Sequence, residues 1–560
     1  MMFLFSRIAF LLFVCWTLPA SAGELTVVSV DPPARVLTAD VTTDIRVTFD
    51  RPVDRDSVIV NQTFWAFARW SGTVTGTIGY ADGDATVILT PTNPLSAGES
   101  VMVILSHDLM ADDGSNLRSA GYSYQFWTRA QPGSLEFEQI DTLSTRTTPG
   151  ESSRAYGGIA SDLNGDRFLD ITVVNEDTAD LRVFLNLADG TGLFDDFLQP
   201  TFPVNQQASP SEPADFNRDG VVDICVANIS TSSVSVLLGN GDGTFAAQQE
   251  MVVGNSPRGI AALDADGDGD LDIANTNFVS SNMSVLLNNG SGAFGAPLFW
   301  EGGASGERAL AAADMNEDGI LDLAIGAISA QQILVNTGNG NGTFSFASSR
   351  ASGGQTWQLV TGDVNADGHD DVAVVNSGNS NGAILLGDGA GQLAAPSVTP
   401  TDPFAIATDL GDLDGDGDLD WLTSSFSGDW RLFRNNGDGT MVFDQEFAAP
   451  AAASCSVMFD FDNDGDMDLG LIDEIADVIV LMRNVGCGAA PSGYGDANGD
   501  GMVDIFDILC VLDGFAGTFN DCAFADVNLA PCPTPDAVID IFDILAVLDA
   551  FAGTASCCAA

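Results

Sequence analysis

The sequence has few basic residues and few histidines. Of its 560 residues, 19 are lysine or arginine, 78 are aspartate or glutamate and two are histidine. The formal charge of −59 excludes a nucleic-acid-binding role, which needs a basic face, and argues against docking on anionic lipid. With only His107 and His369 in the chain, no Ser-His-Asp or Cys-His system and no histidine-based zinc site is plausible. Catalysis by a pair of carboxylates stays open, because acidic residues abound.

Long apolar runs are also missing, except at the N-terminus. Residues 1–22 contain Arg7, an apolar core over residues 8–18 and a small-residue site at 20–22, which is the pattern of a secretory signal peptide. No later segment has the roughly 18 consecutive apolar residues of a membrane helix. We therefore expect a secreted protein, extracellular or associated with the cell surface, with no membrane span in the mature chain.

Cysteines are scarce outside the C-terminal part. Six of the nine lie there, where export permits disulfides; the sequence leaves their connectivity open. Cys225 and Cys455 each stand alone, so we predict that they are buried apolar residues.

What the sequence does contain is a short acidic motif that recurs seven times. Each copy reads Asp-x-Asn/Asp-x-Asp-x-x-x-Asp, and successive copies from Asp162 to Asp460 begin 48 to 53 residues apart. Oxygen ligands at positions 1, 3, 5 and 9, with a backbone carbonyl from position 7, suit a hard cation such as Ca²⁺. Glycine at position 6 permits the positive φ of a tight turn. The first copy has Arg167 there instead and departs most from the pattern.

The spacing of the acidic loops also predicts the fold. A repeat near 50 residues is typical of solenoids and propellers. Each loop is followed by a β-branched run such as 171–174, a second run such as 234–238, and a Gly/Asn/Asp hairpin turn such as 240–245. A third strand and an apolar strand before the next loop complete the four strands of a propeller blade. Seven units over residues 135–486 predict seven blades.

We expect residues 135–139 to pair with the last strand, 478–483, because the seventh unit has no hairpin partner of its own. This pairing would close the ring and remove an exposed edge. A halophile-type acidic surface is the alternative explanation for the charge, but it does not account for aspartates at fixed intervals.

With these motifs, residues 135–486 resemble the FG-GAP or VCBS-type calcium-loop propellers, the fold of integrin α-subunit heads and of many exported bacterial proteins. The segment 292–297 reads Gly-Ala-Phe-Gly-Ala-Pro, close to the family name. The resemblance implies that the residues at the matching positions of every loop bind calcium. The implied calcium ligands are Asp162, Asn164, Asp166 and Asp170; Asp215, Asn217, Asp219 and Asp223; Asp264, Asp266, Asp268 and Asp272; Asp314, Asn316, Asp318 and Asp322; Asp363, Asn365, Asp367 and Asp371; Asp412, Asp414, Asp416 and Asp420; and Asp460, Asp462, Asp464 and Asp468.

Residues 24–130 predict an antiparallel β-sandwich, because short alternating runs are separated by proline, glycine and aspartate. The segments 30–33, 47–53, 89–91 and 95–98 resemble the bacterial Ig-like domains of exported proteins. Such domains usually serve as spacers or weak binding modules.

Residues 495–553 consist of two related halves. The first is an EF-hand-like loop that leads into an apolar helix. The second repeats the helix, but its loop carries an insertion and has Ala537 where the first half has Gly501. The pair resembles dockerin modules, which plug exported proteins into cohesin-bearing partners, and implies a cohesin-like or other surface protein as partner. The predicted ligands are Asp496, Asn498, Asp500, Asp504, Asp507, Asp526, Asn528, Asp536, Asp540 and Asp543.

The sequence thus predicts a mainly β protein: an Ig-like β-sandwich, a seven-bladed β-propeller and a small α-helical dockerin-like EF-hand pair. The leading functional hypothesis is an exported, calcium-binding protein of the binding or adhesion type, without catalytic activity. It would be tethered through the dockerin-like module and would bind a glycan or protein ligand on the propeller.

One alternative is a polysaccharide-active enzyme or carbohydrate-binding subunit of an extracellular degradative complex, and another is a structural envelope component. Four tryptophans bear on the choice, because they could stack on sugars at a blade face, although buried blade positions suit them better. They are Trp300, Trp357, Trp421 and Trp430.

Overall fold

The computed structural model describes residues 23–486. This part of the chain contains 36 strands and two short 3-10 helices, Arg55–Ser57 and Asp82–Asp84, so the prediction of a mainly β protein is confirmed. None of its helices is long and apolar enough to cross a membrane. The predicted signal peptide (1–22) and dockerin-like module (495–553) lie outside the described residues.

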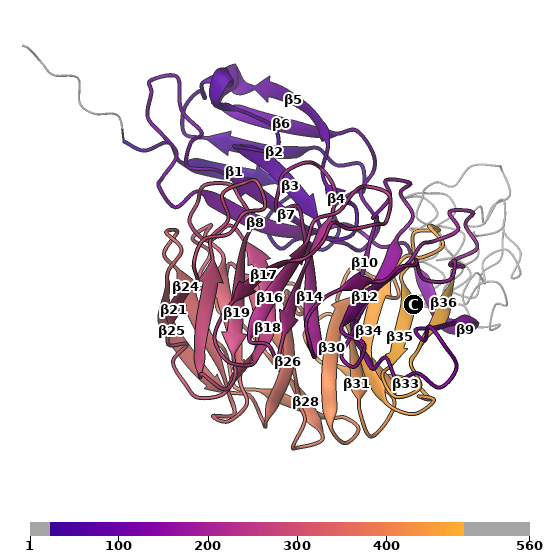
Figure 1. The fold of residues 1–560 in the computed structure, drawn as a ribbon. Coiled ribbons are helices and arrows are strands. Elements are labelled where there is room, and N and C mark those ends of the chain that lie inside the picture. Colours follow the sequence, from indigo (N-terminus) through magenta and orange to yellow (C-terminus); the bar gives the residue numbers. More distant parts are fainter. Residues whose placement is uncertain (1–22, 487–560) are drawn as a thin grey trace, which may run out of the picture.

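The N-terminal domain consists of two four-stranded antiparallel sheets (Figure 1). Its core alternates along the strands, as at Ile45, Val47 and Phe49, which are buried while their neighbours are partly exposed. This is the period of a strand with one buried face. The two sheets, in strand order, are β1 (Val27–Asp31), β2 (Ile45–Phe49), β6 (Thr86–Pro91) and β5 (Gly76–Ala81), and β4 (Gly72–Thr73), β3 (Phe64–Ala68), β7 (Ser100–Leu105) and β8 (Tyr122–Trp127).

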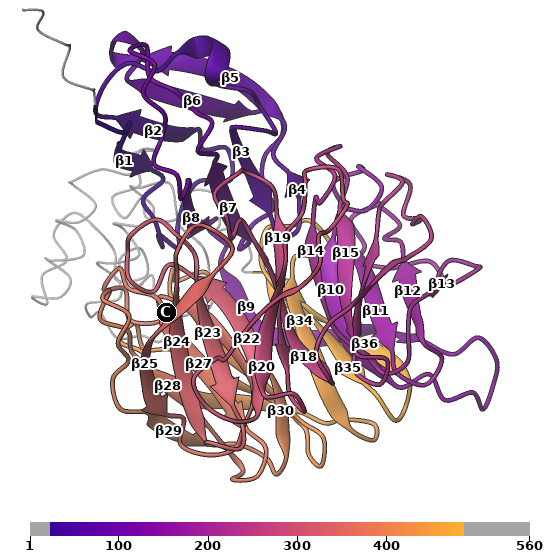
Figure 2. The ribbon, with the colours of Figure 1, turned by 60° about the vertical axis from the view of Figure 1, so that its left-hand side comes forward.

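Residues 133–486 form seven further four-stranded antiparallel sheets (Figure 2). In strand order they are β10 (Ala155–Ser161), β11 (Asp170–Asn175), β12 (Asp180–Phe184) and β13 (Phe202–Pro203); β14 (Ala208–Ala214), β15 (Asp223–Asn228), β16 (Ser233–Leu237) and β17 (Gln249–Val252); β18 (Pro257–Leu263), β19 (Asp272–Asn277), β20 (Asn282–Leu286) and β21 (Leu298–Trp300); β22 (Glu307–Ala313), β23 (Asp322–Ala327), β24 (Gln332–Gly338) and β25 (Phe344–Ala351); β26 (Thr356–Gly362), β27 (Asp371–Asn376), β28 (Asn381–Leu385) and β29 (Ser397–Pro400); β30 (Ala405–Gly411), β31 (Asp420–Ser425), β32 (Trp430–Arg434) and β33 (Val442–Phe447); and β34 (Ala453–Phe459), β35 (Asp468–Asp473), β36 (Val478–Gly486) and β9 (Gly133–Ser144).

These seven sheets form a closed ring. The first strand of each sheet contacts the first strand of the next, and β34 contacts β10. The last sheet takes its outer strand from the beginning of the ring: β9 pairs with β36, with Phe137 opposite Asn484 and Gln139 opposite Met482. The predicted pairing of residues 135–139 with the last strand is therefore confirmed, and it ties the two ends of the ring together.

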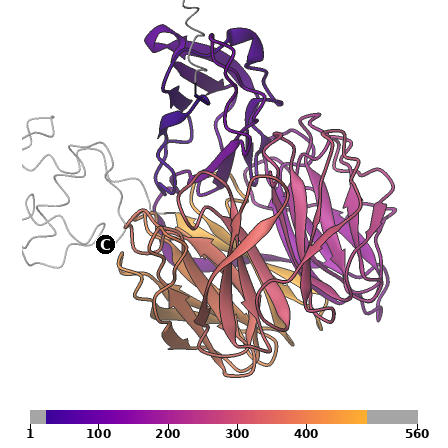
Figure 3. The same ribbon diagram turned by 90° about the vertical axis from the view of Figure 1, so that its left-hand side faces the viewer.

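The N-terminal domain is seated on one end of the ring (Figures 1 and 3). Its second sheet supplies Trp65, Phe67 and Ile104 to a buried cluster that also contains Phe216 and Ile260 from the ring. Strand β3 is buried at every residue, because one face lies on the sandwich core and the other on the ring. The two parts of the chain therefore share a continuous apolar interface.

Candidate metal centres

All seven acidic loops connect the first strand of a sheet to its second strand. Position 1 directly follows the first strand, and position 9 is the first residue of the second strand, as Asp215 and Asp223 illustrate for β14 and β15. The turn needs left-handed backbone at position 6, where the six glycines have φ values from 74° to 99° and Arg167 has 72°. Every loop therefore has the same backbone turn, including the first, which lacks the glycine.

The aspartate at position 9 is fully buried in all seven loops. Asp223 shows the common arrangement: one carboxylate oxygen accepts a hydrogen bond from the backbone N–H of Phe216 (2.9 Å) and the other from that of Gly239 (2.8 Å). The aspartate at position 1 accepts from the backbone N–H of position 6, as Asp215 does from Gly220 (2.9 Å). Backbone N–H groups therefore hold the carboxylates at both ends of each loop in place without the help of an ion.

Burial makes these carboxylates costly to ionise. Burial, together with the neighbouring loop aspartates, raises the pKa of Asp170 and Asp371 to about 7 and that of Asp223 and Asp322 to about 8. The pKa of Asp412, at position 1 of the sixth loop, rises to about 8 for the same two reasons. Groups of this kind favour a proton or a bound cation over a free negative charge.

Four of the loops have asparagine at position 3. In each of them the amide Nδ2 donates a hydrogen bond to the carboxylate at position 5. The donor–acceptor distances are 2.9 Å for Asn164 and Asp166, 2.8 Å for Asn217 and Asp219, 3.1 Å for Asn316 and Asp318, and 2.9 Å for Asn365 and Asp367. The amide therefore partly offsets the repulsion within these loops.

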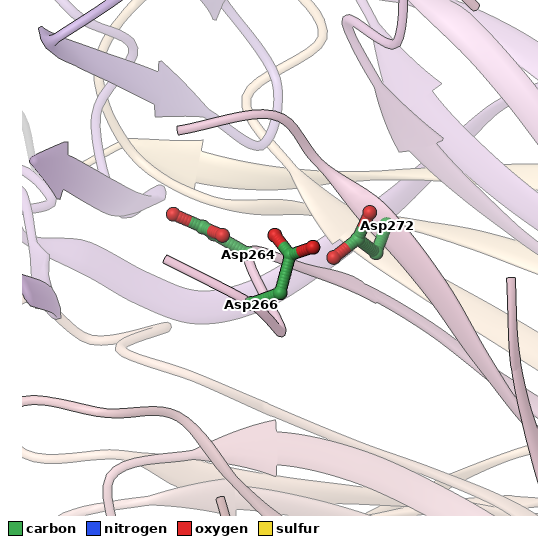
Figure 4. A group of neighbouring side chains, drawn as sticks. All are labelled: Asp264, Asp266 and Asp272. Atoms are coloured by element: carbon green, nitrogen blue, oxygen red, sulfur yellow. The ribbon is translucent and has the colours of Figure 1, made fainter. Parts of the chain in front are cut away.

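The third, sixth and seventh loops instead have aspartate at positions 1, 3, 5, 7 and 9. In each, three carboxylates bring oxygens within 4.8 Å of one another; Figure 4 shows Asp264, Asp266 and Asp272 grouped in this way. One oxygen each of Asp266, Asp412 and Asp462 is buried without a hydrogen-bond partner. Converging carboxylates with unpartnered oxygens are a donor set that fits a hard cation such as Ca²⁺.

The aspartate side chains at position 7 of these loops were not predicted as ligands. Asp270 forms an ion pair with Arg218 of the preceding loop at 2.5 Å. Asp466 has both oxygens buried without a hydrogen-bond partner, and burial together with Asp464, Asp460 and Asp462 raises its pKa to about 9. The signal was present in the alternation of aspartates, which continues through position 7.

A fourth acidic group lies outside the loops and consists of Asp402, Asp429 and Glu446. Arg431 pairs with two of the three, with its guanidinium 2.6 Å from Asp402 and 2.8 Å from Glu446, and the backbone N–H of Ala449 donates to Asp429. A cationic side chain of the protein therefore already lies within this group.

The N-terminal domain lies directly against the acidic loops. Backbone hydrogen bonds join it to three of them: Asp162 N–H donates to Trp70 O (2.8 Å), His107 N–H to Gly267 O (2.7 Å) and Ser123 N–H to Gly319 O (2.9 Å). Gln131, directly after the domain, donates its N–H to Gly465 O (2.8 Å). The Thr73 hydroxyl also donates to the position 1 carboxylate of the second loop, Asp215, at 2.6 Å. The loops that resemble calcium sites are thus also the docking surface of this domain.

Arg35 extends the contact to the fourth and fifth loops. Its guanidinium lies 2.7 Å from the carboxylate of Asp370 and 3.5 Å from that of Asp314, and it also donates to the backbone carbonyl of Asp314. Arg35 and both aspartates are buried. Sequence analysis missed this link, because 335 residues separate Arg35 from Asp370.

The tryptophans and the two isolated cysteines differ in how deeply they are buried. Trp421 and Trp430 are fully buried, as the preferred interpretation expects, whereas Trp357 and Trp300, which stacks on Phe344, are only partly buried. Cys225 is a buried free thiol, whereas Cys455 is a free thiol that is only partly buried.

Comparison with protein families identifies two kinds of module. FG-GAP-like repeats match residues 162–226, 215–275, 314–374, 363–423 and 412–471. The chain contains FG-GAP-like repeats. All seven acidic loops lie within these matched segments. A bacterial Ig-like domain matches residues 22–128, so the N-terminal sandwich is Ig-like.

Solved structures with a similar chain path are distant in sequence. A lectin from Agrocybe aegerita that recognises non-reducing terminal N-acetylglucosamine is 15% identical, with a TM-score of 0.39 over 76% of this chain and 99% of its own. A putative 6-phosphogluconolactonase from Bacteroides fragilis is 13% identical, with a TM-score of 0.41 over 73% and 98%. Kuenenia stuttgartiensis hydrazine synthase is 12% identical, with a TM-score of 0.42 over 61% and 99%. Likeness at this level says nothing about activity. No curated protein matches the sequence.

Comparison of the loops that have asparagine at position 3 with those that have aspartate there predicts a substitution that stabilises the protein. Asp462→Asn should stabilise the metal-free protein by about 1–2 kcal/mol, because the new amide can donate to Asp464 as the four natural asparagines do to their neighbours. In excess calcium the same variant should gain nothing, since an amide oxygen replaces a charged ligand. Thermal unfolding with and without chelator measures both effects. The matched control is Asp196→Asn, at an exposed aspartate; equal shifts in the two variants would contradict the loop explanation.

The raised pKa values predict how the stability of metal-free protein depends on pH. In the folded state Asp170 and Asp371 titrate near 7 and Asp223 and Asp322 near 8, against about 3.9 when unfolded. The folded state therefore holds more protons between these values, and its free energy of unfolding falls as pH rises from about 4 to about 8. Calcium replaces the protons, so its stabilising effect should grow over the same range. Unfolding midpoints at about pH 5.5 and 8, with and without calcium, check this; a metal-free midpoint that rises with pH would refute it.

Proposed function

We propose that this chain is an exported, calcium-binding protein of the binding or adhesion type, without catalytic activity, and that its seven sheets are the blades of a calcium-loop propeller. The observation that carries the proposal is the set of seven equivalent loops, each with a fully buried aspartate at position 9 and, in three of them, converging carboxylates. The FG-GAP-like and Ig-like matches support it, because such modules are typical of extracellular binding proteins.

In each loop the ion would be held by the side chains at positions 1, 3, 5 and 9 and by the carbonyl of position 7. Its contribution is neutralisation of the buried carboxylates. A structural role fits better than a catalytic one, because backbone N–H groups already hold both oxygens of the position 9 aspartate, as for Asp223, and because the N-terminal domain covers the loops.

The proposed tether is the dockerin-like pair of loops and helices in residues 495–553, which would bind a cohesin-like or other surface protein. Support for it comes from the duplicated sequence pattern alone. The alternative of a polysaccharide-active enzyme has less support, because Trp421 and Trp430, two of the four candidate sugar-stacking residues, are buried.

A glycan array followed by product analysis tests the proposal with the full chain in calcium. Retention of a glycan or a surface protein without cleavage is the expected result. Release of shortened products from any polymer would instead make the protein an enzyme. Calcium titration by calorimetry, with binding expected at several loops per chain, tests the metal part of the proposal separately.

A further inference from the structure

A cavity of about 320 Å³ runs along the axis of the ring, lined by the first strands of all seven sheets. The sixth residue before each acidic loop contributes one side chain to it, and we call these seven residues the mouth ring. They are Tyr156, Ser209, Arg258, Arg308, Trp357, Ile406 and Ser454. Six residues of extended chain span about 20 Å, so the mouth ring lies at the end of the cavity away from the acidic loops and the Ig-like domain.

At the opposite end, the Ig-like domain supplies a positive charge to the acidic side chains of the cavity. Arg69 and Trp70 reach into it from the Ig-like side, and Arg69 lies 2.6 Å from the carboxylate of Glu212. The positive charge of Arg69 also lowers the pKa of Asp409, which burial, the larger effect, raises to about 6. The acidic side chains deep in the cavity therefore have a partner within the protein.

The two arginines of the mouth ring feel the charge of Glu176 at a distance but have no direct ion-pair partner among the described residues. Arg258 and Arg308 lie on the adjacent strands β18 and β22 and take part in no ion pair within residues 23–486. Arg308 is only 6% exposed, and the Nε atoms of both side chains are buried without a hydrogen-bond partner. A buried, unpaired cation is unfavourable. It is all the more unexpected in a chain with 78 acidic residues.

Aromatic side chains hold Arg308 in position. Its guanidinium lies 3.4 Å from the centre of the Trp357 ring, and Trp357 Nε1 donates to the Tyr156 hydroxyl at 2.8 Å. The Tyr156 oxygen accepts that bond and one from the Arg308 guanidinium, so its own proton is available to a ligand. Phe404 packs edge-on to Trp357 and is 37% exposed, which adds an apolar surface beside the cationic one.

The nearest acidic side chains are already engaged. Glu474 is buried and lies 2.7 Å from Arg154, and Glu176 lies 3.7 Å from the same guanidinium. Two carboxylates thus share one arginine, and Arg258 and Arg308 remain, so these five side chains carry one net positive charge in a chain of charge −59.

We propose that the mouth ring binds the oxyanion of a small ligand, a carboxylate or a sulfate, and that an acidic sugar is its natural source. Two guanidinium groups and a hydroxyl are strong donors to such a group, and the exposed aromatic edge suits the apolar face of a sugar ring. The cavity is at the lower end of the roughly 300–1,000 Å³ of small-molecule sites, which fits one sugar residue or a chain end. This inference names the ligand class of the proposed binding role and rests on that role, but it involves none of the calcium loops.

Calorimetry of the full chain in calcium tests this inference, with D-glucuronate, inorganic sulfate and D-glucose as probes. Glucuronate should bind, and Arg258→Gln/Arg308→Gln should weaken it about tenfold or more. Arg258→Gln alone, at the less buried position, should show part of the loss and guards against misfolding of the double variant. The control is Arg129→Gln/Arg350→Gln, which removes the same charge at exposed arginines and should bind glucuronate as the parent protein does.

Each outcome decides between sources or rejects the site. Glucuronate binding that exceeds sulfate binding supports an acidic sugar, and equal binding of the two supports an oxyanion site for free anions. Glucose binding as tight as glucuronate, or an equal loss in the control variant, would overturn anion recognition at the mouth ring, as would no binding of any probe. If calcium still binds and stabilises the protein in that case, only this inference fails and the calcium-dependent binding role stands.

Discussion

Chelation of calcium should lower the unfolding temperature of the protein more than any substitution proposed above. The seven position 9 aspartates are fully buried, and three loops bring several carboxylates within 4.8 Å. Extracellular-type sites with dissociation constants of about 10⁻⁴–10⁻³ M would contribute roughly 1.4–2.7 kcal/mol each at about 10 mM calcium. Several such sites act on one ring whose sheets contact each other in sequence, so their contributions should combine.

Thermal unfolding in calcium, in chelator and after calcium is restored measures this effect. Magnesium should restore less than calcium, because it demands near-ideal octahedral geometry and gives up its waters reluctantly. A salt control at equal ionic strength separates binding from screening. Identical unfolding temperatures with and without chelator would refute calcium binding at the loops.

Repetition made the ring predictable from the sequence. Each acidic loop marks the junction of a first and second strand, so seven loops located fourteen strands, and the unpaired run 478–483 pointed to residues 135–139 as its partner. Both inferences use local signals: turn residues, alternation and a missing hairpin. The structure confirms both inferences, because every sheet of the ring repeats the same strand–loop–strand unit.

Contacts between distant parts of the chain were not predictable in this way. Burial does not alternate along strand β3 (Phe64–Ala68), because the sandwich core covers one face of the strand and the ring covers the other. Likewise, the mouth ring consists of one residue from each sheet, which only the closed ring brings together. The sequence shows such residues individually but not their common surroundings.

The Ig-like domain docks on the acidic loops, so its attachment depends on the shape of those loops. Backbone hydrogen bonds join this domain and the segment directly after it to four loops, and a side-chain hydrogen bond joins it to Asp215 of the second loop. A loop that changes shape when its ion leaves would move acceptors such as the carbonyls of Gly267 and Gly465. We therefore expect calcium loss to loosen the Ig-like domain as well as the ring.

Arg35→Ala should weaken this docking by about 3–5 kcal/mol, because it leaves the buried carboxylate of Asp370 without its partner. In the native protein the guanidinium and that carboxylate are 2.7 Å apart, and both side chains are less than a tenth exposed. The matched control is Arg46→Ala, whose pair with Asp44 is 42% and 28% exposed and should be worth about 0–1 kcal/mol.

Unfolding temperature and hydrogen exchange at the fourth and fifth loops would measure the effect of Arg35→Ala in saturating calcium. Asp370→Asn added to Arg35→Ala should restore much of the loss, because it removes the unpaired charge, and the double-mutant cycle isolates the pair. If Arg35→Ala costs no more than Arg46→Ala, the ion pair does not hold the domains together. If the double variant is as unstable as Arg35→Ala, the loss comes from the contact of Arg35 with the Asp314 carbonyl rather than from the stranded charge of Asp370.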